Sequence, residues 1–180
     1  MGAERPSLKA LGLLLALAGA AGLRAESDHG RALQSVPEVE ALAEAATGSR
    51  VAGASPWWFR VEMPGGDAEV RLGAVVVGAF FEAEGIAARE GRVLASSDER
   101  PFSPPVAVVS QRLWSRIAGD VPLDERTLVF NGRPYRIVGV VPDTVVVPQP
   151  TTDIWTTVAA EAPETLNVVE ARFLCIVRDR

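Results

Sequence analysis

Hydrophobic and polar positions change period several times along this chain of 180 residues, and each change marks the limit of an expected element. Between Ser35 and Gly48, apolar residues recur at helical spacing, and Ser35 stands three positions before Glu38, as in a capping box. A helix is therefore expected there. Two shorter helices are predicted in the same way, Ala79–Glu84 and Gln111–Ala118.

Alternating and continuous apolar runs predict the strands. Trp57–Met63 and Ala68–Val77 flank a Pro-Gly-Gly-Asp sequence, which is typical of a hairpin. The second run alternates at first and is continuously apolar at its end, which indicates a strand that enters a covered core. Further strands are expected at Val106–Val109, Asp153–Val158 and Arg172–Val177.

The clearest local signal is Asn131-Gly132, which separates Arg126–Phe130 from Arg133–Val141. This dipeptide suits a two-residue hairpin turn, because both of its positions need positive φ. The turn would place residues of the two strands opposite one another on a shared face. The resulting register pairs Leu128 with Tyr135 and Phe130 with Arg133.

The order of these elements mixes short helices with hairpins and single strands. A polar, proline-bearing loop is expected from Ser96 to Pro105, and another loop is expected after Pro142. This order predicts an α+β fold, in which a mixed or antiparallel sheet with hairpins is packed by two or three short helices. A chain of this length can bury the core of one domain.

The N-terminal segment has the pattern of an export signal. A short basic region precedes an apolar run from Ala10 to Leu23, and polar residues follow it. The run is shorter than the roughly 20 residues that cross a bilayer, so residues 1–25 are expected to be a signal peptide, or alternatively an uncleaved membrane anchor. Residues 26–34 are expected to be a linker. The remainder should face outside the cytoplasm, with membrane association through residues 8–23.

Composition excludes several kinds of chemistry. The net charge of −5, with a single lysine, gives no basic surface for nucleic acid. His29 and Cys175 are the only residues of their types. An internal disulfide, a cysteine or multi-histidine metal site and a histidine-based triad are therefore excluded by count. We expect Cys175 to be a buried thiol and His29 to be exposed in the linker.

The acidic and hydroxyl side chains offer no convincing catalytic set. Asp98, Glu99, Glu82 and Glu84 are expected to be solvated surface charges. Ser110 lacks the glycines of a nucleophile elbow, and capping of the following helix is its expected role. No phosphate-binding glycine pattern or EF-hand spacing occurs. No catalytic, cofactor-binding or metal-binding residue is predicted. Convergence of two or more carboxylates in a cleft would weaken that view, and the candidates are Asp98, Glu99, Asp120, Asp124, Asp143 and Asp153.

The four tryptophans divide into two groups. Trp114 and Trp155 lie on predicted apolar faces and are expected in the core. Core packing is also favoured for the pair Trp57-Trp58, and the alternative is an exposed patch that binds a partner or a membrane surface.

Three segments between Val75 and Pro142 follow one another in a characteristic order. VVVGAFFEAEGIAAREGRVL contains a strand, a Phe-Phe helix start and a later Gly-Arg pair, and Asp98 follows in an acidic position. VAVVSQRLWSRIAGD supplies a strand and a helix, and RTLVFNGRPYRIVGVVP supplies a hairpin. In this order, and over about residues 35–180, the chain resembles the extracytoplasmic core domain of MacB-like, FtsX-type ABC transporter permeases. Glu125 stands where that family usually has a glycine.

The resemblance implies a role in transport. It implies a non-enzymatic extracytoplasmic domain, periplasmic or in the cell envelope, that is associated with an ABC transporter permease. Such a domain would couple to or contact partners or substrate outside the membrane. The implied partners are the transporter's membrane subunits or other envelope proteins, and no cofactor is implied. The alternative is a stand-alone secreted domain that binds a ligand or a protein. Because the family's domain normally continues beyond the position of Arg180 to further membrane helices, we expect a piece of a permease or a free relative of its core domain.

Overall fold

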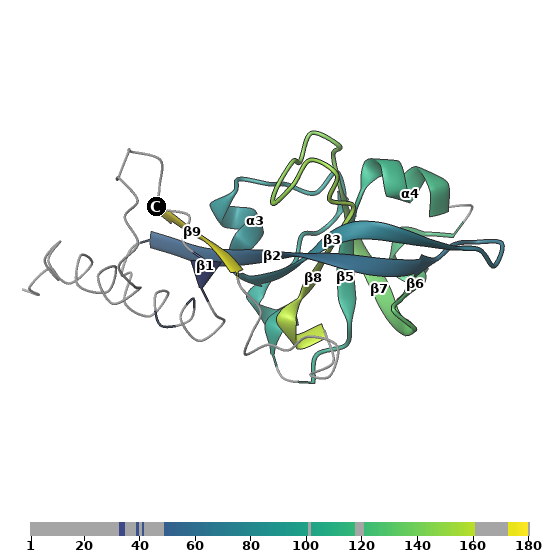
Figure 1. Ribbon diagram of the computed structural model, residues 1–180, viewed down its shortest axis with the longest axis horizontal. Helices are drawn as coiled ribbons and strands as arrows, with labels where there is room; N and C mark the ends of the chain where they lie inside the picture. The colour runs from purple at the N-terminus through teal and green to yellow at the C-terminus, as the bar shows by residue number, and fades with distance from the viewer. Residues whose placement is uncertain are drawn as a thin grey trace, which may run out of the picture.

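The protein has an α+β fold built on one mixed sheet, as the sequence predicts (Figure 1). The computed structural model describes residues 33–34, 39, 41, 49–100, 102–117, 121–160 and 173–179. Two long strands, β2 (Ser49–Glu62) and β3 (Ala68–Gly78), lie along the long axis of the molecule. The other elements, in chain order, are β1 (Leu33–Gln34), α3 (Phe80–Ala83), β4 (Glu90–Gly91), the 3-10 helix η1 (Ser96–Glu99), β5 (Val106–Ser110), α4 (Gln111–Ile117), the 3-10 helix η2 (Leu123–Glu125), β6 (Thr127–Phe130), β7 (Arg133–Val141), β8 (Ile154–Thr157), the 3-10 helix η3 (Val158–Ala160) and β9 (Phe173–Asp179).

The strand pairings close into a ring. The strands follow the order β1-β9-β2-β3-β8-β5-β7-β4, and β6 pairs with both β2 and β7. The pairs β3–β8 and β5–β7 are parallel, and the other pairs among the described strands are antiparallel. The ring runs in the order β2-β3-β8-β5-β7-β6 and returns to β2. Each of these six strands pairs with its two neighbours in the ring, as in a small barrel. The β2–β6 contact is narrow, and it consists of Val61 opposite Phe130 and two hydrogen bonds of 2.9 Å between Arg60 and Asn131.

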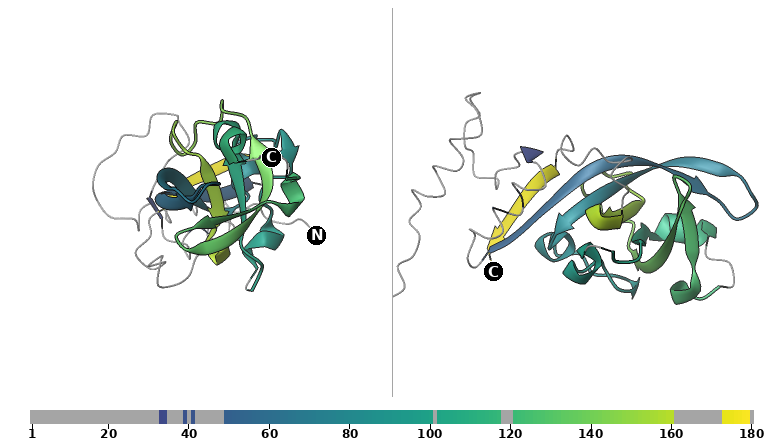
Figure 2. Two further views of the ribbon diagram at one scale, coloured as in Figure 1. Left: turned by 90° about the vertical axis from the view of Figure 1, so that its right-hand side faces the viewer. Right: turned by 90° about the horizontal axis from the view of Figure 1, so that it is seen from below.

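Alternation along the strands separates two hydrophobic clusters. The first contains Phe59, Phe130, Tyr135 and residues of α4, and the second contains Trp155 and residues of α3. α3 and α4 therefore cover opposite faces of the sheet. Seen from below in Figure 2, the β2–β3 hairpin arches along one side of the molecule, and the teal and green segments that follow it lie on the concave side.

Both predicted hairpins are confirmed. Asn131 and Gly132 have φ of 51° and 78°, as a two-residue turn requires, and Leu128 pairs with Tyr135 and Phe130 with Arg133. In the other hairpin, the Met63 amide donates to the Asp67 carbonyl at 2.8 Å. Its first strand begins at Ser49 rather than Trp57, because residues 49–54 pair with β9 and the ladder with β3 already begins at Ala52.

The remaining predicted elements can be compared within the described ranges. The predicted helices at Ala79–Glu84 and Gln111–Ala118 and the three further strands are confirmed, with small differences at their ends. Leu33 and Gln34, at the end of the segment expected to be a linker, pair with β9, and the loop predicted at Ser96–Pro105 contains η1. Of the helix expected at Ser35–Gly48, Val39 and Ala41 are helical and the rest lies outside the described residues, as does the N-terminal export segment with His29. No helix within the described ranges is long and apolar enough to span a bilayer.

Candidate functional site

Asp98 is buried, so the prediction of a solvated surface charge is wrong for this residue. Its side chain accepts two hydrogen bonds from the Arg92 guanidinium, at 2.6 and 2.8 Å, and one of 2.9 Å from the Ala95 amide. Burial acts to raise the pKa of the Asp98 carboxyl. The hydrogen bonds and the positive charges of Arg92 and Arg136 outweigh burial, so this pKa lies below its usual value. The hydrogen bond to Asp98 also raises the pKa of Arg92.

The same region holds η1 against the sheet. The Thr157 hydroxyl donates to the Asp98 carbonyl at 3.3 Å, and the Gly78 amide donates to the Glu99 carboxylate at 3.1 Å. Both acidic residues of η1 are thus engaged in folding contacts, and they face different partners. Glu82 lies on the surface, as predicted, and pairs with Arg50 at 3.2 Å.

Asp153 is the second buried carboxylate, and it organises the start of α4. It accepts hydrogen bonds of 2.5 Å from the Ser110 hydroxyl and 3.4 Å from Arg71, and it forms an ion pair of 2.5 Å with Arg112. Ser110 in turn accepts a hydrogen bond of 3.2 Å from the Leu113 amide, which confirms its role as the helix cap. The hydroxyl proton and an acceptor site of Ser110 are both in use, which fits a structural role.

Two of the six candidate carboxylates do converge. Asp143 accepts a hydrogen bond of 2.8 Å from the Arg112 amide, so Asp143 and Asp153 both reach the first turn of α4. Their partners are a helix amide, a capping hydroxyl and a guanidinium, which is an arrangement that anchors a helix rather than one that opens to a substrate. Asp120 and the side chain of Asp124 lie outside the described residues. In the described part of the chain, no group of three or more His, Cys, Asp or Glu residues could hold a metal ion.

The tryptophan predictions are confirmed for three residues and wrong for one. Trp114 and Trp155 are buried, and Trp57 is partly buried against the first cluster. Trp58 is 64% exposed. Because successive strand residues point to opposite faces, the neighbour of a core-facing tryptophan must face outward on this strand. The side chain of Cys175, in β9, lies outside the described side chains.

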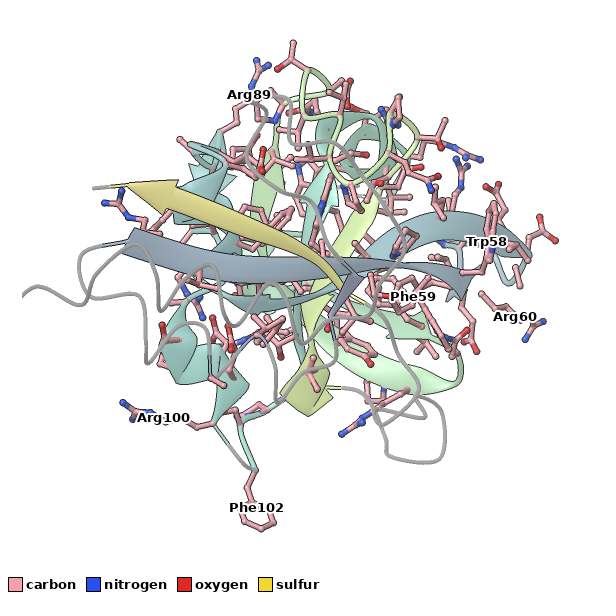
Figure 3. The ribbon with its side chains drawn as sticks, turned by 60° about the vertical axis from the view of Figure 1, so that its left-hand side comes forward. Trp58, Phe59, Arg60, Arg89, Arg100 and Phe102 are labelled. Atoms are coloured by element: carbon pink, nitrogen blue, oxygen red, sulfur yellow. The ribbon has the colours of Figure 1, made fainter. Side chains whose placement is uncertain are left out.

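Trp58 belongs to an exposed apolar surface on the distal half of the hairpin. Val70 on β3 is 66% exposed and pairs with Arg60, and Trp58 pairs with Leu72, so all four residues share one face of the hairpin. We call Trp58, Arg60 and Val70 the hairpin patch. In Figure 3, Trp58 and Arg60 lie on the same side of the molecule, and Arg60 points away from it.

A second exposed aromatic side chain, Phe102, projects from a loop elsewhere on the surface (Figure 3). The Ser103 amide donates to the Arg100 carbonyl at 3.0 Å, which closes a four-residue turn with Phe102 at its third position. The φ of Phe102 is 67°, a value for which turns normally use glycine. An L-residue with a bulky side chain incurs strain of about 1–2 kcal/mol in this conformation. The fold therefore holds a phenylalanine in water at a local cost in energy.

Comparisons with known proteins agree on one family. The chain matches the family of MacB-like periplasmic core domains over residues 11–174. The macrolide export ATP-binding/permease protein MacB of Aggregatibacter actinomycetemcomitans is 33% identical over 64 residues, which are 36% of this chain and 10% of that protein. This chain thus spans a small part of that curated relative.

Solved structures share the fold at low sequence identity. The periplasmic region of MacB from Actinobacillus actinomycetemcomitans superposes with a TM-score of 0.61 at 18% identity, over 85% of this chain and 67% of that one. The extracellular domain of the noncanonic ABC-type transporter YknZ from Gram-positive bacteria superposes with a TM-score of 0.59 at 8% identity, over 82% of this chain and 73% of that one. A domain of a putative permease protein from Porphyromonas gingivalis superposes with a TM-score of 0.51 at 19% identity, over 83% of this chain and 63% of that one. Since the family match covers most of the chain, the protein belongs to the MacB-like periplasmic core domains of ABC transporter permeases, and it is extracytoplasmic.

Proposed function

We propose that this protein is a non-enzymatic contact domain of an ABC transporter permease, which transmits conformational changes of the transporter to a protein partner outside the membrane. The partner is a membrane subunit of the transporter or another envelope protein. Within this proposal, residues 1–25 are the signal peptide or anchor, residues 26–34 lead out of it, and residues 35–180 are the core domain. The hairpin patch is the observation on which the proposal rests.

The patch has the chemistry of a protein-binding surface. Aromatic and arginine side chains are enriched at the energetic centres of interfaces, and Trp58, Arg60 and Val70 supply both with an aliphatic neighbour. These residues lie on β2 and β3, which pair without interruption from Ala52 opposite Gly78 to Glu62 opposite Ala68. A partner would therefore bind a preformed surface, and little conformational entropy would be lost.

The reactive side chains support the non-enzymatic part of the proposal. Asp98 is held by Arg92, Asp153 by Ser110 and Arg112, and Asp143 by the first turn of α4. Each of these carboxylates is occupied by a contact within the fold, whereas Trp58 and Val70 are exposed and apolar. This division is what a domain that acts through contact requires.

The test is site-specific photo-crosslinking in cells that contain the intact transporter. A photoreactive phenylalanine analogue replaces Trp58, and the same analogue at Val146, which is 52% exposed and lies outside the patch, is the matched control. Position 58 should give an adduct with a transporter subunit or another envelope protein, and the yield should change when ATP hydrolysis is blocked. Position 146 should give little adduct. Equal adducts at both positions, or a yield at position 58 that ignores ATP hydrolysis, would argue against the proposal.

A further inference from the structure

A hollow of about 320 Å³ lies between β4, η2 and β7, away from the hairpin patch. Pockets for small ligands span roughly 300–1,000 Å³, so this one suits a ring or a short chain. It is lined by Gly91, Arg92, Leu123, Arg136, Ile137 and Val138. The lining thus combines aliphatic groups with two guanidinium groups, and it contains no acidic residue.

The walls of the hollow are fixed by close backbone contacts. The Arg92 amide donates to the Val138 carbonyl at 2.9 Å, and a Cβ added to Gly91 would lie 2.3 Å from the same oxygen. On the facing strand, a Cβ added to Gly139 would lie 1.9 Å from the Arg92 carbonyl oxygen. Two glycines therefore let β4 and β7 approach, and the hollow has a preformed edge.

The two arginines differ in what they bind. Arg92 is held by both oxygens of Asp98, which neutralises it. The exposed Arg136 side chain makes no hydrogen bond or ion pair with any other described residue, although its charge acts on Asp98. Two guanidinium groups and one carboxylate leave one positive charge beside an aliphatic wall. Because Arg92 is paired with Asp98, the excess positive charge is localised at Arg136.

We propose that this hollow binds an anionic amphiphile, with its carboxylate or phosphate group on Arg136 and its apolar part against Leu123 and Val138. Arginine presents a fork of donors that matches either oxyanion. Burial of the apolar part removes its surface from water, which adds to the affinity. This site goes beyond the proposed contact function, because it lies on other elements and does not depend on a protein partner.

The test is a titration of the full 180-residue chain with decanoate below its micelle concentration, followed by amide chemical shifts in NMR spectra. Decanoate should shift the amides of Gly91, Arg92 and Val138 saturably. Acetate, which lacks the chain, and 1-decanol, which lacks the charge, should bind at least about tenfold more weakly. Shifts centred on the hairpin patch, or equal binding of decanoate and 1-decanol, would overturn the proposal.

Substitution identifies the anchoring residue. Arg136→Gln should weaken decanoate binding about tenfold and leave the backbone fold intact, because the Arg136 side chain has no hydrogen bond or ion pair with another described residue. Arg133→Gln, on the same strand but outside the hollow, is the matched control and should bind like the parent. Equal affinity of all three proteins would exclude Arg136 as the anion site.

A second arm locates the source of the anion. Sedimentation with phosphatidylglycerol vesicles that is lost in Arg136→Gln would assign the site to a lipid headgroup. Decanoate binding without sedimentation would assign it to a free amphiphile, and the absence of both would overturn the proposal.

Discussion

Single residues of the family pattern have physical roles in this fold. One example is the Gly-Arg pair with the acidic residue that follows it. These residues, Gly91, Arg92 and Asp98, act together to hold β4 in place. The glycine lets β4 approach β7, and the arginine then ties β4 to η1 through a carboxylate that is shielded from water. A spacing seen in sequence thus corresponds to a local cross-link between two short elements.

The first prediction concerns the pH dependence of this cross-link. Asp98→Asn should lower the free energy of unfolding at pH 7 by about 2 kcal/mol, the scale of hydrogen bonds to a charged group. Because the pKa of Asp98 in the folded protein lies below its unfolded value of about 3.9, this contribution is complete above that value and is lost as pH falls through the folded pKa. Urea unfolding between pH 7 and pH 2 should show the two proteins converging below about pH 4. A gap as large at pH 2 as at pH 7 would contradict the ion-pair account.

The second prediction separates backbone strain from steric conflict. Gly91 and Gly85 have the same φ of 66°, but only at Gly91 would an added Cβ meet neighbouring atoms. Gly85→Ala should therefore cost about 1 kcal/mol, and Gly91→Ala clearly more, since β4 must also move from β7. Thermal unfolding of the two variants measures the difference. An equal loss of stability in the two variants would show that β4 can move away from β7 at no cost in free energy.

Among the secondary-structure elements, the hairpin of β6 and β7 depends most on one dipeptide. Gly132→Val should lower the free energy of unfolding by about 1–2 kcal/mol, because a β-branched residue resists the positive φ of this turn. Gly132→Asn is the matched control and should cost less, since asparagine tolerates that conformation. Denaturant unfolding distinguishes them. A valine variant as stable as the asparagine variant would show that the turn is not held in this form.

The elements that sequence predicts are those whose signals are local. The Asn131-Gly132 turn, the Ser110 cap and the apolar run at β5 carry their cause within a few residues. The first half of β2 does not, because small residues and Pro56 become a strand only when β9 and β3 pair with them. β1 and β4 likewise exist only through a distant partner.

The candidate site was harder to predict than the fold, for the same reason. Asp153 is buried because Ser110 and Arg112, far away in sequence, approach it, and no local pattern announces that contact. The exposure of Trp58 follows from strand alternation once Trp57 is placed against the core. Two adjacent tryptophans on one strand therefore have different environments.

For the whole molecule, the prediction concerns how it leaves the cytoplasm. A fusion of residues 1–40 to a reporter that is active only outside the cytoplasm should give activity, because the apolar run from Ala10 to Leu23 follows a basic start. Replacement of two central leucines of the run by arginine should abolish the signal at equal expression. A silent parent fusion that is expressed normally would mean that residues 1–40 do not carry the export signal.

The length of β2 gives the molecule a mechanical property. Its 14 residues include the ladder with β9 at Ser49 and the junction with β6 at Val61, which at 3.3 Å per residue are about 40 Å apart along the strand. The pairing with β3 has no bulge that could absorb strain, and a strand can slip in register only by exchanging every buried side chain for an exposed one. β2 therefore connects the ladder with β9 at one end of the strand to Trp58 near the other end without a break in its pairing with β3 from Ala52 onward.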